Sequence, residues 1–302
     1  MKLLLTGAFK YSQEQLNTIH SLGYEVTFVQ DERVPLDIDV TKFEAVVCNN
    51  LFLYNDITKF KNLKFIQLTS AGLDRVPFDY IKEKGIKIFS AKDVYSVPMA
   101  ECVVLKILEI YKKSKWFYKN QNEHIWDKQR DLLELTDKTA AIIGFGSVGY
   151  EVAKRLRAFD VKVIGVGRRY IESDLLDEYY LIEDIDQVLN KIDIVILTLS
   201  LTEETRHLID RDKIKNMKDN SALVNVSRGG VIDEVALIEA IKSEKFLGVA
   251  LDVFEEEPIS KDDLLWDLEN VIITPHNSFV SDKVNERLFK CIEANLRLIL
   301  KI

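Results

Sequence analysis

The side chains of this chain that could do chemistry follow a glycine-rich turn in its second half. The turn reads Gly144-Phe-Gly-Ser-Val-Gly149. Three later segments supply an arginine, glutamates and a histidine in that order: Asn225-Val-Ser-Arg-Gly-Gly-Val-Ile-Asp233, Leu251-Asp-Val-Phe-Glu-Glu-Glu-Pro258 and Thr274-Pro-His-Asn-Ser278. A guanidinium group binds a carboxylate through two hydrogen bonds, and an imidazole exchanges a proton near neutral pH. Together these residue types could hold a carboxylate ligand and move a proton to or from it.

The glycine-rich turn has the sequence context of a phosphate-binding loop. It follows the apolar run Thr139–Ile143, and Val148, Val152, Leu156 and Phe159 behind it share one helical face. In this order of strand, turn and helix, the first glycine permits the tight turn, the second lets the backbone approach a pyrophosphate, and the third lets the helix pack on the strand. A glycine turn with a purely structural role is the alternative. The context favours dinucleotide binding at the positive end of the helix.

Arg228 and His276 each come just after a predicted strand. Arg228 follows the apolar run Ala222–Val226, and His276 follows Val271–Thr274. Ligands of open α/β sheets bind at the carboxyl edge, so both side chains are predicted to face a ligand. An arginine beside two glycines could instead belong to a surface turn, and a lone histidine is more often structural. The other histidines, which no such motif surrounds, are interpreted as structural or exposed: His20, His124 and His207.

These motifs, in this order, give the chain a resemblance to the D-isomer-specific 2-hydroxyacid dehydrogenases. The resemblance extends over essentially the whole chain, from Ser70-Ala-Gly-Leu-Asp74 through Ala100-Glu101 and Trp126 to the Thr-Pro-His segment. It implies an α/β fold with two Rossmann-like domains. A doubly wound, parallel-sheet dinucleotide-binding domain, residues 98–278, would be inserted into a flavodoxin-like substrate domain, residues 1–97 and 279–302. It also implies hydride transfer between NAD(P)H and a small 2-keto or D-2-hydroxy acid.

The resemblance assigns a role to each motif. Arg228 would bind the substrate carboxylate, His276 would be the general acid and base, and Glu257, directly before a proline, would hydrogen-bond the imidazole. Glu255 and Glu256 are interpreted as a solvated face, and a glutamine in place of Glu257 would be typical of formate dehydrogenase. Residues implied in cofactor binding are Gly144, Gly146, Ser147, Val148, Gly149, Arg168, Arg169, Leu199, Thr205, Val226, Ser227, Asp252 and Asn277. Residues implied in substrate binding are Asn50, Ser70, Ala71 and Gly72.

The cofactor preference is predicted from the residues after the apolar run Lys162–Val166. In an NAD-binding domain, an acidic residue at this point bonds the ribose 2′-hydroxyl. This chain has Gly167-Arg168-Arg169 instead, so no carboxylate repels a 2′-phosphate and two guanidinium groups could bind it. We therefore expect NADP to be preferred over NAD. Two departures from the resembled family concern the nicotinamide pocket: Ser200 stands where a proline is usual, and Asn277-Ser278 replaces Ile-Gly or Ile-Ala.

Composition narrows the classes of protein that remain. The chain has 302 residues, of which 47% are hydrophobic and 30% charged, which is ordinary for a globular protein of two domains. Its net charge of −8 disfavours a nucleic-acid partner. No run approaches the roughly 20 apolar residues of a membrane span, and the N-terminus lacks a signal cleavage pattern, so a cytoplasmic location is expected. Cys48, Cys102 and Cys291 are far apart in apolar surroundings, which indicates reduced thiols and no metal centre.

The elements that must position these residues alternate between apolar runs and segments of helical spacing, which predicts parallel α/β units. The charged segment Lys106–Arg130 carries an apolar stripe and predicts a long helix that crosses from one unit to the other. In the resembled family this helix and the arm after it form a homodimer; packing within the chain is the alternative. The amphipathic segment Ser281–Ile302 is predicted to return to the first domain. The predicted strands are Leu3–Leu5, Val26–Val29, Ala45–Cys48, Phe65–Leu68, Lys87–Phe89, Thr139–Ile143, Lys162–Val166, Ile192–Thr198, Ala222–Val226, Gly248–Leu251 and Val271–Thr274.

Several functions within and beyond the resembled family fit these residues. A glyoxylate or hydroxypyruvate reductase is the first expectation. Oxidation of 3-phosphoglycerate in serine synthesis is the alternative, with Arg75 as the nearby candidate to bind the phosphate. Because the chain ends soon after its last predicted helix, no appended regulatory domain is expected. A dinucleotide-sensing corepressor, whose function is partner binding, is the alternative from another class, and the intact Arg228, Glu257 and His276 disfavour it.

Overall fold

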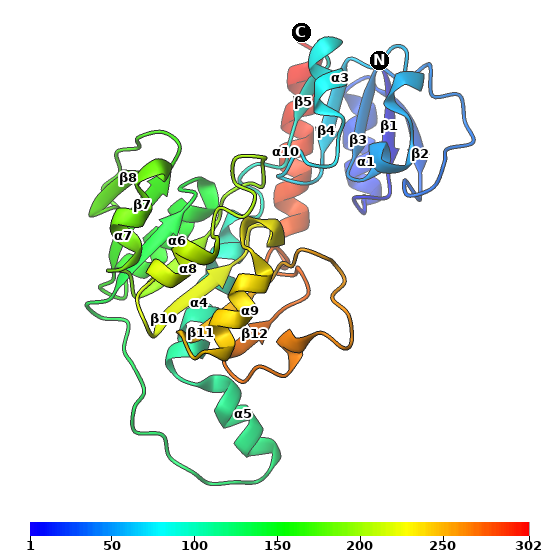
Figure 1. Ribbon diagram of the computed structural model, residues 1–302. Helices are drawn as coiled ribbons and strands as arrows, with labels where there is room; N and C mark the ends of the chain where they lie inside the picture. The colour runs from blue at the N-terminus through cyan, green and yellow to red at the C-terminus, as the bar shows by residue number, and fades with distance from the viewer. Residues whose placement is uncertain (302) are drawn as a thin grey trace. The chain divides into compact units, whose positions relative to one another are not determined.

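The computed structural model describes residues 1–301 of the chain (Figure 1). These residues divide into two compact units. The first consists of Met1–Tyr95 together with the segment that begins at Ser281, and the second consists of Ser96–Val280. Each unit contains a parallel sheet with helices packed on both faces. The second unit is thus inserted into the sequence of the first, and both belong to the α/β class.

The sheet of the first unit has the strand order β2-β1-β3-β4-β5. Neighbouring strands pair in parallel, with Leu4 opposite Thr27 on one side and Val46 on the other. The chain moves outward from β1 in one direction to β2 and in the other direction to β3, so the order reverses between β1 and β3. Each apolar run predicted in this half is a strand: β1 (Lys2–Thr6), β2 (Glu25–Val29), β3 (Ala45–Cys48), β4 (Phe65–Leu68) and β5 (Lys87–Phe89).

The two faces of this sheet are covered by different helices. Successive side chains of a strand point to opposite faces, so Leu3 and Leu5 enter one core while Leu4 enters the other. The first core is closed by α1 (Gln13–Ser21) and α10 (Val284–Ile299), and the apolar side of α10 contributes Leu288, Ile292 and Leu296. The other face is covered by α2 (Leu51–Tyr54), η1 (Ile57–Lys59) and α3 (Phe78–Glu83).

The sheet of the second unit has the strand order β12-β11-β10-β9-β6-β7-β8. Its central strand β6 leads to β7 on one side, and the chain later returns to β9 on the other side, so the order reverses between β6 and β9. This reversal creates the crevice in which open α/β sheets bind ligands. The strands are β6 (Thr139–Ile143), β7 (Lys162–Gly167), β8 (Glu178–Leu181), β9 (Ile194–Leu197), β10 (Ser221–Asn225), β11 (Phe246–Leu251) and β12 (Val271–Ile273).

Helices cover both faces of the second sheet, which explains why its strands read as continuous apolar runs. Helices α4 (Ser96–Tyr111) and α6 (Ser147–Arg157) close one core, to which β6 contributes Ala140 and Ile142. The opposite core takes Ala141 and Ile143 from the same strand and is closed by the remaining helices. These are α7 (Asp186–Leu189), α8 (Arg211–Asn216) and α9 (Glu234–Lys242), with the short turns η2 (Ile182–Asp184), η3 (Gly229–Val231) and η4 (Leu264–Trp266) between strands.

The prediction of one long helix over Lys106–Arg130 is wrong. The segment contains the end of α4 and a separate helix, α5 (Ser114–Asn122), and both lie in the second unit. Between them Lys113 adopts the left-handed conformation (φ 51°), which ends a helix. The Lys112 and Lys113 ammonium groups donate to Leu133 O (2.7 Å) and Asp131 Oδ2 (2.6 Å). The break is thus tied to the chain that returns from α5 to β6, drawn as an extended segment in Figure 1.

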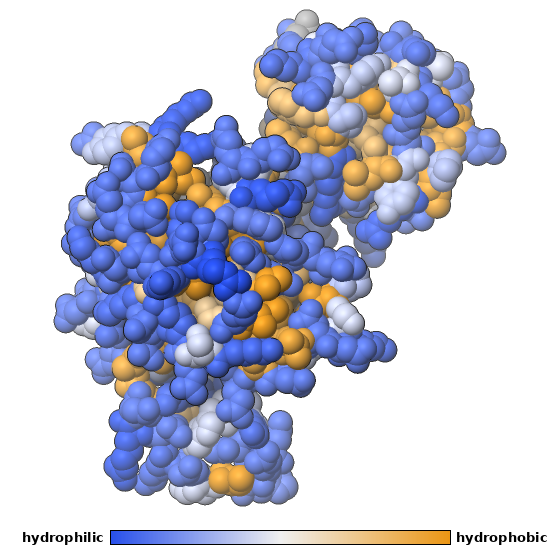
Figure 2. Space-filling view, viewed as in Figure 1, coloured by the Kyte–Doolittle hydropathy of each residue, from blue (hydrophilic) through white to orange (hydrophobic). Residues whose placement is uncertain are grey.

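Strand β8 was not predicted. It is the edge strand of the second sheet, pairs with β7, and reads Glu-Tyr-Tyr-Leu, so it lacks the apolar run of a doubly covered strand. The faces of both units that Figure 2 shows are mostly hydrophilic, with hydrophobic residues in small patches. Over residues 1–301, we find no helix whose length and apolar character would let it cross a bilayer.

Candidate active site

The glycine-rich turn leaves the central strand of the second sheet at the point where the strand order reverses. Gly144 follows β6 with φ +98°, and its N–H donates to Val166 O of the neighbouring strand (2.8 Å). A Cβ at this position would lie 2.6 Å from the backbone of Leu199, which follows β9. Glycine is therefore required here both for the positive φ and for the close approach of the two strand ends.

The next two glycines differ in what surrounds them. Gly146 caps α6, its backbone conformation is extended, and a Cβ would meet no atom within 4 Å. Gly149 lies inside the first turn of α6, where a Cβ would be 3.0 Å from Ile142 of β6. The helix therefore packs tightly on the strand, with Val148 against the same core, while open space borders Gly146 at the N-terminus of the helix, next to Ser147. This arrangement fits a pyrophosphate, because the helix N–H groups and dipole favour an anion there.

The segment after β7 carries the predicted 2′-phosphate ligands. Arg168 and Arg169 follow Gly167 directly and are exposed. Because β6 and β7 are neighbours in register, this segment lies at the same sheet edge as the glycine turn. The Arg168 guanidinium is 3.8 Å from the Glu204 carboxylate, and both side chains are mostly exposed, so this ion pair contributes little to stability.

Arg228 lies beyond the carboxyl end of β10. Its backbone is extended and leads into η3, and Nη1 donates to Ser227 O (2.8 Å). The buried Asn225 fixes this turn: its side-chain oxygen accepts from the N–H and hydroxyl of Ser227 (3.0 and 2.8 Å), and its Nδ2 donates to Arg228 O (3.1 Å). Val226 is buried in the core. Sequence reasoning missed Asn225, and an asparagine that ends an otherwise apolar strand is the signal that could have found it.

His276 and Glu257 form a hydrogen-bonded pair at the ends of the next two strands. His276 Nδ1 lies 2.7 Å from Glu257 Oε2, and 29% and 35% of the two side chains are exposed. The other carboxylate oxygen, Oε1, accepts from Phe254 N (3.1 Å). Glu257 thereby occupies Nδ1 of the imidazole, so Nε2 is the ring nitrogen that can meet a ligand. Such a carboxylate fixes the imidazole tautomer and stabilises its charged form.

Asp252 holds the segment that carries His276. It is 2% exposed at the end of β11. Its Oδ1 accepts from Thr274 Oγ1 (2.6 Å) and Asn277 N (2.8 Å), and its Oδ2 accepts from Ser278 N (3.0 Å). His276 N donates to the backbone oxygen of Asp252 (2.8 Å). A buried carboxylate therefore organises the turn after β12, a role that the sequence, which indicated a cofactor ligand at this position, did not predict.

The segment after β9 is organised by its own threonines. Thr205 is buried, and its hydroxyl donates to Ser200 O (2.7 Å) and accepts from Thr202 N (2.8 Å). Ser200, which replaces a more usual proline, thus contributes a backbone acceptor to this turn. Leu199 is held against Gly144 as described above. The structure therefore brings Leu199 next to the glycine turn and uses the Thr205 hydroxyl to shape the segment.

The candidate substrate residues lie in the first unit, after β3 and β4. The Ser70 hydroxyl donates to Gly72 O (3.0 Å), and Ser70 O accepts from Ala91 N (2.8 Å), so Ser70, Ala71 and Gly72 form a compact turn. After β3, the buried Glu32 accepts from Asn50 N (2.5 Å) and from Asn49 N (3.1 Å). Sequence reasoning missed Glu32 because it stands in the charged run Asp31-Glu32-Arg33, which is typical of a solvated loop.

Arg228, Glu257 and His276 follow the neighbouring strands β10, β11 and β12, so the second unit gathers an anion-binding group and a paired imidazole at one sheet edge. The family model of the D-isomer specific 2-hydroxyacid dehydrogenase NAD binding domain matches residues 104–278. The chain belongs to this family. The glycine turn and the segments that carry Arg228, Glu257 and His276 all lie in the matched range, and the family assignment made from the sequence is confirmed.

Similar proteins carry several activity names. The chain is 40% identical to a hydroxypyruvate reductase of Thermotoga maritima over 72% of its own length and 71% of the relative. It is 35% identical to a D-3-phosphoglycerate dehydrogenase of Methanocaldococcus jannaschii over 81% of its length, but it spans only 47% of that relative. The match to a second D-3-phosphoglycerate dehydrogenase, from Archaeoglobus fulgidus, also covers only about half of that relative, 53% of its length.

Solved structures agree with the two-sheet architecture. A glyoxylate reductase from Paecilomyes thermophila superposes with a TM-score of 0.87 at 26% identity, covering 100% of this chain and 95% of that one. A D-lactate dehydrogenase from Aquifex aeolicus, complexed with NAD and lactic acid, has a TM-score of 0.81 at 26% identity over 99% of this chain and 95% of that one. The predicted Rossmann-like α/β fold is therefore confirmed.

Proposed function

We propose that this chain reduces a small 2-keto acid to its D-2-hydroxy acid with a nicotinamide cofactor, NADPH in preference to NADH. The observation that carries the proposal is the His276–Glu257 pair, 2.7 Å apart, in the segments that follow β12 and β11, next to the strand β10 that Arg228 follows. In this assignment the unit Ser96–Val280 is the dinucleotide-binding domain. The unit built from the two ends of the chain is the substrate domain.

The cofactor supplies a hydride to the carbonyl carbon when it is bound. The glycine turn of residues 144–149 would hold its pyrophosphate, and the fit rests on the open space beside Gly146 and the N-terminus of α6. Leu199, Val226, Ser227, Asp252 and Asn277 surround the same sheet edge and would line the nicotinamide end. Thr205 would act by shaping the segment after Leu199.

The residues of the chain would bind the acid and move the proton. The Arg228 guanidinium would bind the substrate carboxylate through two hydrogen bonds and polarise the adjacent ketone. As the carbonyl oxygen gains negative charge, His276 would donate a proton to it from Nε2, which completes the alcohol. Glu257 holds Nδ1 and balances the charge of the imidazolium. In the oxidative direction His276 would take the proton back.

Arg168 and Arg169 support the preference for NADPH. They stand where an acidic residue binds the ribose 2′-hydroxyl in NAD-dependent domains, and two guanidinium groups suit a 2′-phosphate. Arg168 is 3.8 Å from Glu204, and 63% of its side chain is exposed, so it is accessible to a phosphate. NAD remains the alternative cofactor of this proposal.

Glyoxylate or hydroxypyruvate is the substrate that we propose first. Similar proteins with these names are 29–40% identical to the chain. Asn50, Ser70, Ala71 and Gly72 would contact the acid from the substrate domain through the turns that follow β3 and β4. Oxidation of 3-phosphoglycerate is the second candidate, favoured by relatives of that name, and Arg75 is the basic residue near the Ser70 turn that could bind its phosphate.

We also propose a homodimer formed through α5 and the segment after it. Trp126 is 93% exposed and Ile125 is 49% exposed, and the half-buried Phe117 lies near them. These side chains help line a hollow of about 670 Å³ over residues 117–130. A large exposed indole is a costly surface feature unless a partner covers it. A cytoplasmic location fits the cysteines, which are unpaired in the described part of the chain.

A panel of 2-keto acids tests the proposed activity. Oxidation of NADPH is followed with glyoxylate, hydroxypyruvate, 3-phosphohydroxypyruvate and pyruvate, with the His276→Ala variant as the matched control. We expect turnover of glyoxylate or hydroxypyruvate by the natural chain and near-background rates in the variant. If no keto acid is turned over while NADPH still binds, the chain acts as a dinucleotide-binding protein such as a corepressor, and the enzymatic proposal is wrong.

A further inference from the structure

Tyr179 of β8 lies across the end of β7, beside the segment that carries Arg168 and Arg169. Its hydroxyl donates to the backbone oxygen of Arg169 at 2.7 Å. The ring has room there because β7 carries glycines on the facing side. A Cβ on Gly167 would overlap the phenol oxygen, and a Cβ on Gly165 would lie 2.7 Å from Cδ2 of the ring. A side chain at either position would clash with the tyrosine, and one at position 165 would also clash with Leu176.

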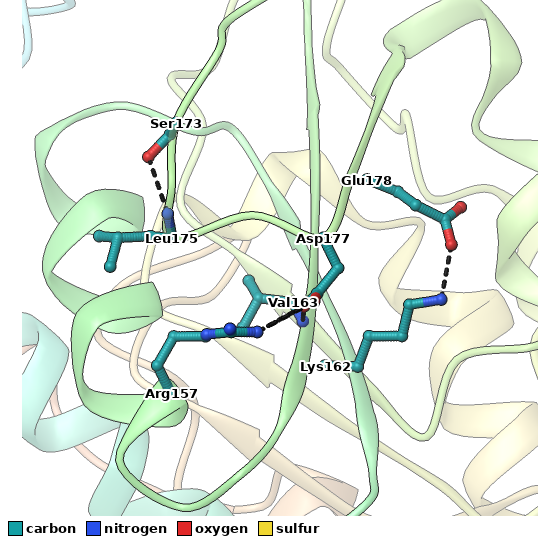
Figure 3. A network of polar contacts seen from close by, with 7 residues as sticks. All are labelled: Arg157, Lys162, Val163, Ser173, Leu175, Asp177 and Glu178. Carbon is teal, nitrogen blue, oxygen red and sulfur yellow. Dashed lines mark hydrogen bonds and ion pairs between the residues drawn. The ribbon is translucent and has the colours of Figure 1, made fainter.

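The other end of the segment is held by a carboxylate. Figure 3 shows Asp177 between Arg157 and Val163, from α6 and β7. Asp177 accepts from Arg157 Nη1 at 2.8 and 3.0 Å and from Val163 N at 2.8 Å, and its own N–H donates to Val163 O at 2.8 Å. The stretch 168–177 is thus fastened to β7 at its far end by Asp177 and near its start by Tyr179.

We propose that Tyr179 is a positioning residue for cofactor selection, which presents Arg168 and Arg169 to the 2′-phosphate of NADPH. This inference rests on the proposed NADPH preference. The tyrosine touches no ligand in this account; it acts by holding the peptide between Arg169 and Tyr170. Tyr170 stands against it edge to face, with ring centroids 5.6 Å apart.

The physical reason is the flexibility of arginine side chains. A long, exposed side chain loses conformational freedom when it binds a phosphate, and a mobile backbone would add to that loss. A backbone that is already held in place reduces the loss and lets both guanidinium groups meet the same anion. Burial raises the pKa of Tyr179 above its usual value, so the phenol remains a hydrogen-bond donor at physiological pH.

The effect should be confined to ligands that carry a 2′-phosphate. The pyrophosphate is assigned to the glycine turn after β6, and that turn does not involve Tyr179. Loss of the tyrosine hydroxyl should therefore lower the affinity for NADPH and leave the affinity for NADH nearly unchanged. A merely structural role would affect both ligands alike or would affect only the stability of the fold.

Calorimetric titration with 2′,5′-ADP and 5′-ADP tests this without turnover. In Tyr179→Phe, which keeps the ring and removes the donor, we expect affinity for 2′,5′-ADP to fall about fivefold, the size of one lost hydrogen bond, and affinity for 5′-ADP to stay constant. Tyr180→Phe is the matched control. Tyr180 is the adjacent residue, its side chain packs against the opposite core, and its hydroxyl bonds Glu178 Oε2 at 2.7 Å. The control should bind both ligands as the natural chain does.

Gly167→Ala gives a second variant that leaves Tyr179 itself intact. The added methyl group would displace the phenol, so this variant should reproduce the selective loss seen with Tyr179→Phe. If the natural chain binds 2′,5′-ADP no better than 5′-ADP, the NADPH preference itself is wrong. If it discriminates but Tyr179→Phe retains the full ratio, or loses both affinities equally, the role of Tyr179 is overturned while the preference stands.

Discussion

His207 Nε2 lies 2.5 Å from Glu255 Oε1, two residues before the glutamate that pairs with His276. The second unit therefore contains two histidine–glutamate pairs that use the same short acidic run. His207 N also donates to Gly230 O (2.8 Å), so this pair links the turn after Arg228 to the acidic run. The His207 and Glu255 side chains are 45% and 39% exposed, more than those of the other pair, 29% and 35%. The His207–Glu255 pair is therefore an internal control for the role that we assign to the His276–Glu257 pair.

Replacement of the two histidines should have very different effects on turnover. His276→Ala should lower kcat by roughly 10²–10⁴, the usual contribution of a general acid. His207→Ala removes a half-exposed hydrogen bond to Glu255, and such surface contacts contribute only about 0–1 kcal/mol, so kcat should fall by no more than about fivefold. Steady-state kinetics with the best keto acid decide the matter. Equal losses in the two variants would mean that both pairs merely shape the site.

Arg228→Lys should separate substrate binding from cofactor binding. A lysine keeps the charge but lacks the planar fork, so the two parallel hydrogen bonds to the carboxylate are lost. We expect kcat/KM for the keto acid to fall by roughly 10- to 100-fold, equivalent to one or two charge-assisted hydrogen bonds. The affinity for NADPH, measured by fluorescence titration, should change less than about twofold. A variant that loses NADPH affinity to the same extent would contradict the assignment of Arg228 to the substrate.

Elements that bury an apolar face could be predicted from the sequence. The runs Leu3–Leu5 and Thr139–Ile143 became central strands because only a strand covered on both faces has such composition. The glycine turn could also be predicted from the sequence, because each of its glycines stands where a side chain would be sterically or conformationally unfavourable or would block the approach of a ligand. The Glu257–His276 contact followed from a resemblance rather than from spacing, because 19 residues separate the partners.

Features that depend on contacts between distant segments could not be predicted. The helix break at Lys113 is fixed by a contact with Asp131, on chain that returns much later. Gly167 is explained by Tyr179, and Gly165 by Tyr179 together with Leu176; the tyrosine belongs to an edge strand that has no apolar run of its own. Glu32 gave no signal because a buried carboxylate and a solvated one have the same sequence context. In each case the deciding partner lies outside the local pattern.

The cysteine thiols should be unreactive in the native chain. Burial raises the pKa of Cys102 to about 11, and it also raises the pKa values of Cys48 and Cys291. The thiolate is the reactive form, and at pH 8 a thiol with that pKa is ionised in about one molecule in a thousand. Reaction with Ellman's reagent should therefore be slow in buffer and rapid in guanidinium chloride, where all three thiols of the chain become accessible. Rapid labelling of the native protein would show that a thiol is exposed and ionised.

Two glycines of the second unit give opposite predictions for the same substitution. Gly229 lies so close to Phe254 that a Cβ would overlap the backbone carbonyl group of the latter, which neither partner can relieve by rotating a side chain. Gly229→Ala should therefore destabilise the fold by at least about 2 kcal/mol and lower the melting temperature by several degrees.

Gly146→Ala adds a methyl group where no atom lies within 4 Å, so its stability should be close to that of the natural chain. Because that open space is where we assign the pyrophosphate, the same variant should bind NADPH at least about tenfold more weakly, as expected when a backbone can no longer approach the phosphates. Thermal unfolding with and without NADPH measures both effects. If NADPH stabilises the Gly146→Ala variant as much as it stabilises the natural chain, the cofactor does not bind at this turn.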